Sequence, residues 1–241
     1  MSSYKSSAQL KGIAREKSLG KYGTLIGANI IILAIQLFIS AITSVYGGSS
    51  LILFIINNLI TLVVTILLGV LMSGKAYLYM NLLYSQPVST SDIFFGMRKH
   101  PQKAVIIQSV FASVDFLFSL PSQILLFRYQ SAPSTNTMAA VFLALGIALI
   151  VNVYVSLVYS QSFFILHDFP DRSAKEILAT SRRLMKGNKF RLFYLSVSFI
   201  PLYLLGCITM FIPLLWVSVY RYATFCAFYQ DLIENASRSS Q

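Results

Sequence analysis

Long apolar runs divide this chain, and each run is long enough to form a helix that crosses a lipid bilayer. A spanning helix needs about 20 mostly apolar residues. The final run is too long for one span and contains Pro201 and Pro213. We interpret it as a hairpin in which one helix ends near residues 207–210 and Pro213 lies in the first turn of the next. The sequence therefore predicts six spans, within residues 22–45, 51–72, 104–127, 138–166 and, for the last two, 192–232.

The composition agrees with a chain that is solvated by lipid. Only 11% of the residues are charged and 56% are hydrophobic, whereas soluble domains have about 25% charged residues. The first apolar run is longer than the apolar core of a secretory signal, which is about 7–15 residues. We therefore expect an all-α, polytopic membrane helix bundle over 22–232, preceded by a basic cytoplasmic segment (1–21) and followed by a short cytoplasmic tail (233–241).

The basic residues indicate the orientation of the six spans. All nineteen Lys and Arg residues except Arg128 and Arg221 lie before residue 22, within 73–103, within 167–191 or after 232. Cytoplasmic loops carry an excess of Lys and Arg, so we expect both termini in the cytoplasm. The net charge of +11 has the same origin, and we expect no nucleic-acid partner.

Short amphipathic helices are predicted between the spans on the cytoplasmic side. Ser173 and Glu176 fit a capping box, and the helix that follows carries Ile177, Ser181 and Met185 on one face. Such a helix is expected to lie in the headgroup layer. Residues 91–100 and 9–21 are similar, which suggests a threefold repeat of basic helix, span, turn and returning span. The alternative is that any six-span chain with cytoplasmic ends shows three hairpins.

These basic segments face the leaflet that is rich in anionic lipid, where each Lys or Arg near the surface contributes about 1 kcal/mol to binding. We therefore expect the partners to include the bilayer and its anionic headgroups, besides an unidentified membrane protein. The candidate contacts are Lys175, Arg182, Arg183, Lys186, Lys189 and Arg191.

Two charged residues fall inside predicted spans. Asp115 lies near the middle of the third span and Arg221 near the middle of the sixth. A charge at that depth costs about 2.5–3.5 kcal/mol on insertion scales, so we predict that the two side chains form an ion pair. The alternative is that Arg221 extends toward the headgroups and Asp115 is neutral, or that each has its own polar neighbour. Further polar groups predicted within spans are Asn57, Asn58 and Asn152.

Residues for catalysis and for cofactor or metal binding are scarce. Cys207 and Cys226 lie in apolar stretches without a Cys or His cluster, as expected of small hydrophobic residues. His167 and Asp168 could form a metal or acid–base pair, but a lone pair at a helix end is more typical of a span boundary, because a site needs several convergent groups. The sequence has no P-loop, HExxH or GxSxG motif. We expect no enzyme activity, cofactor or metal.

The stretch from Tyr159 to Leu232 carries the strongest resemblance to a known family, and the resemblance extends over the whole chain. The run SRRLMKGNK at 181–189, together with YSQSFFIL at 159–166 and AFYQDL at 227–232, is similar to an uncharacterised family of Gram-positive bacterial membrane proteins, domain of unknown function nine-seven-five. The chain departs from that family's pattern at Pro201 and Val219. The resemblance implies a bacterial cell membrane protein but no reaction. More distantly, the chain is similar to the non-catalytic membrane domain of some glycerophosphodiester phosphodiesterases.

Three functions are compatible with these features. The first is a non-enzymatic scaffold or regulatory partner at the cytoplasmic leaflet. The second is a small transporter or permease subunit with a polar site at mid-membrane, lined by Asp115, Arg221, Asn57 and Asn58. The third, a membrane enzyme that acts on lipid, needs a cluster of His, Asp or Glu at the cytoplasmic surface, and the sequence offers none.

Overall fold

The computed structural model describes residues 4–44 and 50–238, apart from the side chains of 42–44 and 131, and every regular element in this part is helical. The fold class is therefore all-α. The elements are α1 (Ser7–Ser18), α2 (Tyr22–Ser44), α3 (Leu51–Leu67), α4 (Gly69–Leu83), the 3₁₀ helix η1 (Thr90–Phe94), α5 (Phe95–Arg98), α6 (Pro101–Ser131), α7 (Thr135–Tyr159), α8 (Ser162–Asp168), α9 (Ala174–Leu184), α10 (Lys189–Val197), α11 (Ile200–Ile208) and α12 (Leu214–Arg238).

Five helical stretches in the described part are long and apolar enough to cross a membrane: Tyr22–Ala41, Leu51–Leu83, Pro101–Gln130, Thr135–Asp168 and Lys189–Ile208. The helix of the predicted sixth span, α12, is not among them, since it includes Arg221, Asp231 and Glu234. The count of six therefore stays a prediction. Because α12 continues to Arg238, the predicted tail of 233–241 begins inside a helix.

Several of the long helices are interrupted. Residues 51–83 form α3 and α4, which meet at Leu68, so the predicted span of 51–72 crosses a break. The break between α10 and α11 lies before Pro201. Proline has no N–H and its ring clashes with the carbonyl four residues earlier, which here is Val197, the last residue of α10. Helix α11 ends at Ile208, within the predicted 207–210, whereas Pro213 precedes the first residue of α12 instead of lying in its first turn.

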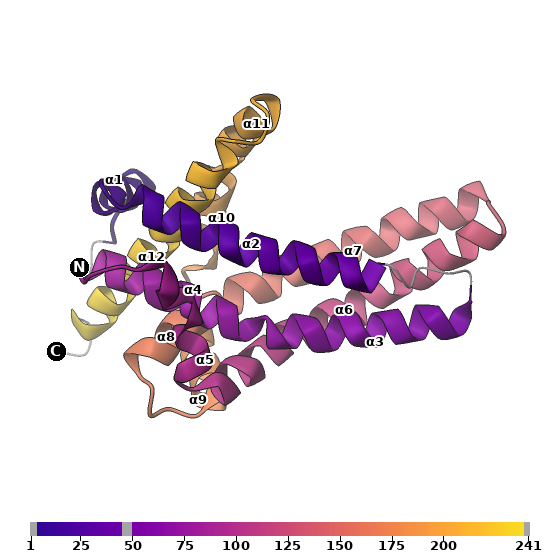
Figure 1. Cartoon of the computed structure of the whole chain (residues 1–241), viewed down its shortest axis with the longest axis horizontal. Coiled ribbons are helices and arrows are strands. Elements are labelled where there is room, and N and C mark those ends of the chain that lie inside the picture. Colours follow the sequence, from indigo (N-terminus) through magenta and orange to yellow (C-terminus); the bar gives the residue numbers. More distant parts are fainter. Residues whose placement is uncertain (1–3, 45–49, 239–241) are drawn as a thin grey trace.

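The helices form three successive hairpins that differ in how tightly they associate. The α2/α3 hairpin and the α6/α7 hairpin lie side by side, whereas α11 and the start of α12 diverge from them (Figure 1). The two termini lie at the same end of the molecule (Figure 1). Away from the termini, helix α3 has no buried residue, so its apolar side chains lie on the surface of the molecule.

Each hairpin is preceded by a short helix that begins with a capping box. Ser6 and Gln9 cap α1, Ser89 and Asp92 cap η1, and Ser173 and Glu176 cap α9. In each case the serine hydroxyl accepts a backbone N–H and the third residue reaches back to the serine N–H, which satisfies two otherwise unpaired donors. Each segment ends at a residue with positive φ: Gly20, His100 or Gly187.

The first and third units share one register. The same interval separates Ser6 from Ser173 and Gly20 from Gly187. It also relates two sets of buried residues in order, Leu10, Ala14, Ser18, Leu25, Ala28 and Ile32 in one unit and Ile177, Ser181, Met185, Leu192, Leu195 and Phe199 in the other. Chance hairpins in a six-span chain do not require matching caps, stops and buried positions. The structure therefore favours the repeat.

The packing follows the same threefold order. The returning helix of each hairpin packs on the short helix of the next unit: α4 on η1 and α5, α8 on α9, and α12 on α1. The last of these contacts joins the end of the chain to its beginning. The core lies where α4, α8 and α12 meet, and it includes Tyr79, Phe164 and Tyr229.

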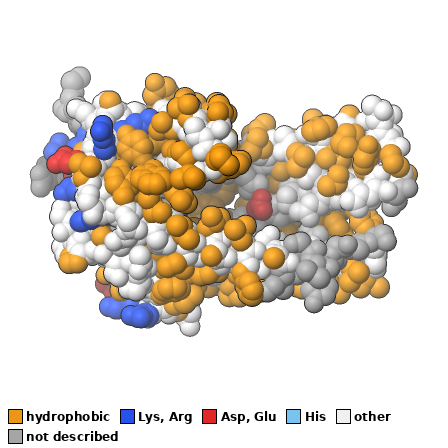
Figure 2. Space-filling view, turned by 45° about the horizontal axis from the view of Figure 1, so that its top comes forward, with side chains coloured by type: hydrophobic (Ala, Val, Ile, Leu, Met, Phe, Trp, Pro, Cys, Tyr) orange, Lys and Arg blue, Asp and Glu red, His pale blue; other side chains and the backbone are white. Residues whose placement is uncertain are grey.

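Side-chain types are segregated along the long axis. Lys and Arg side chains gather at one end, and hydrophobic side chains cover much of the remaining surface, which is hollowed between the two ends (Figure 2). A surface this apolar fits a chain solvated by lipid, since a monomeric soluble protein rarely exposes large continuous apolar patches.

Candidate functional site

Asp115 lies in a polar cleft between the second and first hairpins. It is on α6, and its Oδ1 accepts a hydrogen bond of 2.9 Å from Nδ2 of Asn152 on α7. The cleft has a volume of about 420 Å³. Its lining is unusually polar for helices of this hydropathy: Thr65, Gln108, Asp115, Asn152 and Ser156, with Phe111, Ala112 and Val153. Such groups within a membrane are candidates for a functional role.

The predicted pair between Asp115 and Arg221 is not formed, which corrects that expectation. The Arg221 guanidinium lies 5.0 Å from the centre of the Phe225 ring, and its Nη1 is 3.5 Å from the Tyr203 hydroxyl. The reason is the packing of the helices. Helix α6 packs on α3, α4 and α7, whereas α12 packs on α1, α2 and α4. Of the two alternatives, a separate polar neighbour for each residue describes the structure.

Sequence reasoning identified Asp115 and Asn152 separately but missed that they are partners. The signal was present, because α6 and α7 form an antiparallel hairpin whose turn lies at 132–134. Asp115 and Asn152 are almost equally far from that turn, which places them opposite each other. Gln108 was also missed. It lies seven residues before Asp115, a spacing that puts both side chains on one face of a helix.

The other predicted polar residues lie outside this cleft. Nδ2 of Asn58 donates to the Phe54 carbonyl of its own helix at 2.9 Å. The Asn57 amide oxygen is buried and has no hydrogen-bond partner within the described part of the chain. Neither residue lines the Asp115 cleft. The predicted polar site is therefore formed only in part, without Arg221, Asn57 or Asn58.

Helix α9 presents a basic outer face. Ile177, Ser181 and Met185 are buried against the rest of the molecule. The Ser173 backbone N–H donates a hydrogen bond to the Glu176 carboxylate. Hydrogen bonds from the backbone and the side chain of Ser173 lower the pKa of that carboxyl. The side chains on the outer face are exposed, and no ion pair within 4 Å is found for them in the described part of the chain: Lys175, Arg182, Arg183 and Lys186.

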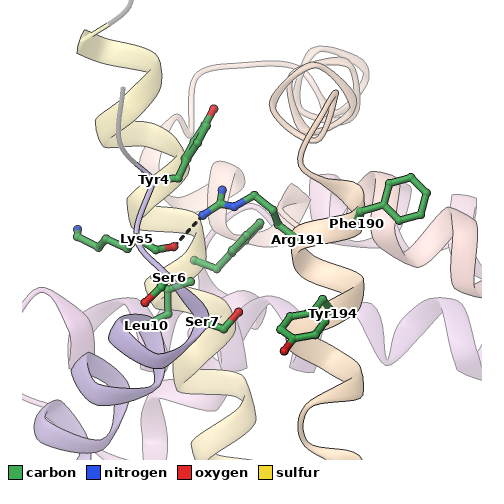
Figure 3. Close-up of a pocket in the computed structure, with 9 residues that line it drawn as sticks. Tyr4, Lys5, Ser6, Ser7, Leu10, Phe190, Arg191 and Tyr194 are labelled. Atoms are coloured by element: carbon green, nitrogen blue, oxygen red, sulfur yellow. Dashed lines mark hydrogen bonds between the residues drawn. The ribbon is translucent and has the colours of Figure 1, made fainter. Parts of the chain in front are cut away.

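Arg191, by contrast, is committed to a structural contact. Its Nη2 is 2.9 Å from Oδ2 of Asp231, whose side chain is only 1% exposed. The same nitrogen donates to the Lys5 carbonyl at 3.0 Å, and the guanidinium lies 4.2 Å from the Tyr4 ring centre. The pocket in which these groups meet has a volume of about 460 Å³ (Figure 3). Arg191 connects the N-terminal segment to α10 and α12, so its guanidinium is occupied by contacts within the protein.

Lys189 lies beside a tyrosine of the second hairpin. Its Nζ is 3.1 Å from the Tyr154 hydroxyl and 4.6 Å from the centre of that ring. Tyr154 is on α7 and Lys189 is the first residue of α10, so the contact bridges two hairpins. Lys189 is half-buried, and among the residues that the structure describes no carboxylate lies within ion-pair distance of it.

The chain matches over residues 1–236 the family model described as "Protein of unknown function (DUF975)". It belongs to that family. No curated protein and no solved structure matches the chain, so the similarity to the membrane domain of glycerophosphodiester phosphodiesterases stays a prediction. Membership covers nearly the whole chain of this DUF975 protein but assigns no reaction to it.

In this DUF975 protein, His167 and Asp168 serve different contacts. Nε2 of His167 is 2.8 Å from the Ser73 carbonyl on α4, whereas Asp168 accepts a 2.6 Å hydrogen bond from the Tyr229 hydroxyl on α12. Among the described residues no three His, Cys, Asp or Glu side chains are grouped as metal ligands. The two residues join α8 to α4 and α12 in the core.

Proposed function

We propose that this DUF975 protein is a non-enzymatic membrane scaffold whose basic end associates with anionic lipid of the cytoplasmic leaflet. The observation that carries the proposal is the basic outer face of α9, where Lys175, Arg182, Arg183 and Lys186 are exposed. Ion pairing within the chain leaves its net charge of +11 unchanged, and the two ion pairs in the described part, Lys5–Glu234 and Arg191–Asp231, involve none of these four side chains.

The position of α9 supports this function. Its apolar face is anchored by burial of Ile177 and by the Ser181 hydroxyl, which donates to the Val158 carbonyl of α7 at 3.0 Å. The outer face is therefore held in one orientation relative to the apolar helices. A preformed basic face gains affinity because little conformational entropy remains to be lost on binding.

The full chain, reconstituted in phosphatidylcholine vesicles, provides the test. Electron paramagnetic resonance of spin-labelled lipid measures how phosphatidylglycerol and phosphatidylcholine partition to the protein surface. We expect phosphatidylglycerol to be preferred, and the triple variant K175Q/R183Q/K186Q to lose about fivefold in this preference per charge removed. High salt should weaken the preference. Arg128→Gln, at the opposite end of α6, is the control and should leave it unchanged. Equal partitioning of the two lipids would refute the proposal.

A second candidate, a small transporter, is favoured by the Asp115–Asn152 cleft. A solute path requires that water reaches the cleft. With Cys207 and Cys226 replaced by serine, Asp115→Cys should react with a membrane-impermeant thiosulfonate. Ile124→Cys is the matched control, because Ile124 lies on the same helix and is 43% exposed to the surroundings. If Asp115→Cys is as unreactive as this control, the transporter candidate fails.

A further inference from the structure

An apolar groove runs between the second and third hairpins, beside the Asp115 cleft, with which it shares Val153. It separates α7 from α10 and has a volume of about 550 Å³. No acidic side chain lines it. The lining consists of Leu149, Ile150, Val153, Tyr154 and Leu157 from α7 and Lys189, Phe190 and Phe193 from α10.

One end of this groove is polar and positively charged. Lys189 Nζ lies 3.1 Å from the Tyr154 hydroxyl, and the hydroxyl can donate while the ammonium supplies further N–H donors. Arg182, on α9, does not line the groove, but its charge acts on the Tyr154 hydroxyl at this end. Its neighbour Ser181 bonds to the carbonyl of Val158, one helical turn beyond Tyr154. The polar end therefore combines two cations and a phenol.

The polar end of the groove lies toward the basic end of the molecule. Helix α7 runs toward that end, so Tyr154 lies nearer to it than Ile150 does. On α10, Phe193 lies one helical turn beyond Lys189 and on the same face. Lys189 and Tyr154 thus form one polar cluster in an otherwise apolar lining, which matches a molecule with a charged head and an apolar tail.

We propose that this groove is a binding site for one anionic phospholipid, with an acyl chain between α7 and α10 and the phosphate at Lys189 and Arg182. The charge complementarity decides the occupant, since two cations without a facing carboxylate favour an anionic headgroup over a second copy of this basic chain. The inference rests on the proposed association with anionic lipid and assigns it a defined site.

The groove gives the lipid contacts that an annular lipid lacks. Phe190 is 86% exposed, Ile150 is 70% exposed and Leu149 is 65% exposed, so their side chains are free to cover an acyl chain on both sides. Burying a methylene group is favourable where the alternative is water. In the bilayer this gain is much smaller, because lipid tails solvate the chain equally well, so selectivity must come from the headgroup.

Native mass spectrometry tests the site on the full chain, purified in mild detergent and exposed to phosphatidylglycerol or to phosphatidylcholine. We expect one phosphatidylglycerol to be retained per chain and phosphatidylcholine to be retained at least about fivefold less, as expected for a charge-assisted contact of about 1 kcal/mol. Lys189→Gln should lower phosphatidylglycerol retention about fivefold. Ile150→Trp should abolish it by filling the groove.

Ile208→Trp is the matched control. Ile208 lies on α11, outside the groove, and is 79% exposed. It should retain the lipid fully, and equal monodispersity of both tryptophan variants in size-exclusion chromatography shows that each is folded. Equal retention by Ile150→Trp and wild type would overturn the groove. Loss of the bound lipid in the triple variant K175Q/R183Q/K186Q would also overturn the groove, because the lipid would then be bound on the outer face of α9. If retention fails while the spin-label preference persists, only the groove is wrong. If the lipid is retained while the spin-label preference is absent, the groove proposal stands and the surface proposal is wrong.

Discussion

Replacing Arg191 by glutamine should destabilise the fold strongly, because it leaves the buried Asp231 carboxylate without its cation. Removing one partner of a buried ion pair costs about 3–5 kcal/mol. The Arg191 side chain is 27% exposed, and Asp231 keeps the Lys5 backbone N–H as a donor at 3.1 Å. Both facts favour the lower limit, about 3 kcal/mol, which is more than a hundredfold in the unfolding equilibrium.

Titration of the protein from dodecyl maltoside into sodium dodecyl sulfate, followed by fluorescence of Trp216, measures this loss. The double variant R191Q/D231N should be more stable than R191Q alone, because it removes the unpaired charge as well. Lys186→Gln is the control. Lys186 is exposed and has no ion pair in the described structure, so its loss should stay within about 0.5 kcal/mol. A similar small effect for R191Q, or a double variant no better than R191Q, would contradict the argument.

Four further substitutions test helix packing and the capping box of α9. A Cβ at Gly74 would overlap the Ile93 carbonyl, so Gly74→Ala should destabilise the protein by at least the 1–3 kcal/mol typical of overpacking. A Cβ at Gly146 would have no neighbour within 4 Å, so Gly146→Ala should stabilise α7 by about 0.5–1 kcal/mol. Thermal unfolding in detergent distinguishes the two variants. Ser173→Ala should cost about 1 kcal/mol through loss of the cap. The pKa of the Glu176 carboxyl is lowered in the fold. Its contribution to stability is therefore complete above the unfolded pKa of about 4.5 and is lost as pH falls through the lowered pKa. If the thermal stability of Glu176→Gln falls as much as that of the wild type in this acid range, the argument is wrong.

The sequence contained most of the information on where helices begin and end. Apolar runs gave the long helices, and Ser173 with Glu176 marked a cap that the structure confirms, whereas the break before Pro201 was not predicted. The caps at Ser6 and Ser89 have the same spacing and were equally readable. Hydropathy works well here because a helix in lipid must satisfy its backbone within itself, whatever its neighbours are.

The candidate site was less predictable because it depends on how each helix is rotated and which helix lies beside it. The depth of Asp115 followed from its position in an apolar run, but depth alone allowed Arg221 as a partner. Only the packing of α6 on α7 selects Asn152. Likewise, nothing local distinguished Arg191 from Arg182. Their difference arises from Asp231, which follows forty residues after Arg191 on another helix.

The contact between α12 and α1 makes the order of the three units circular. Lys5 is bound by groups of α10 and α12, so the beginning of the chain is held where a continuation of the third unit would otherwise lie. Packing alone would therefore allow any of the three units to come first. A chain whose present ends are joined by a flexible linker and whose new ends lie at the 132–134 turn would keep every contact between units.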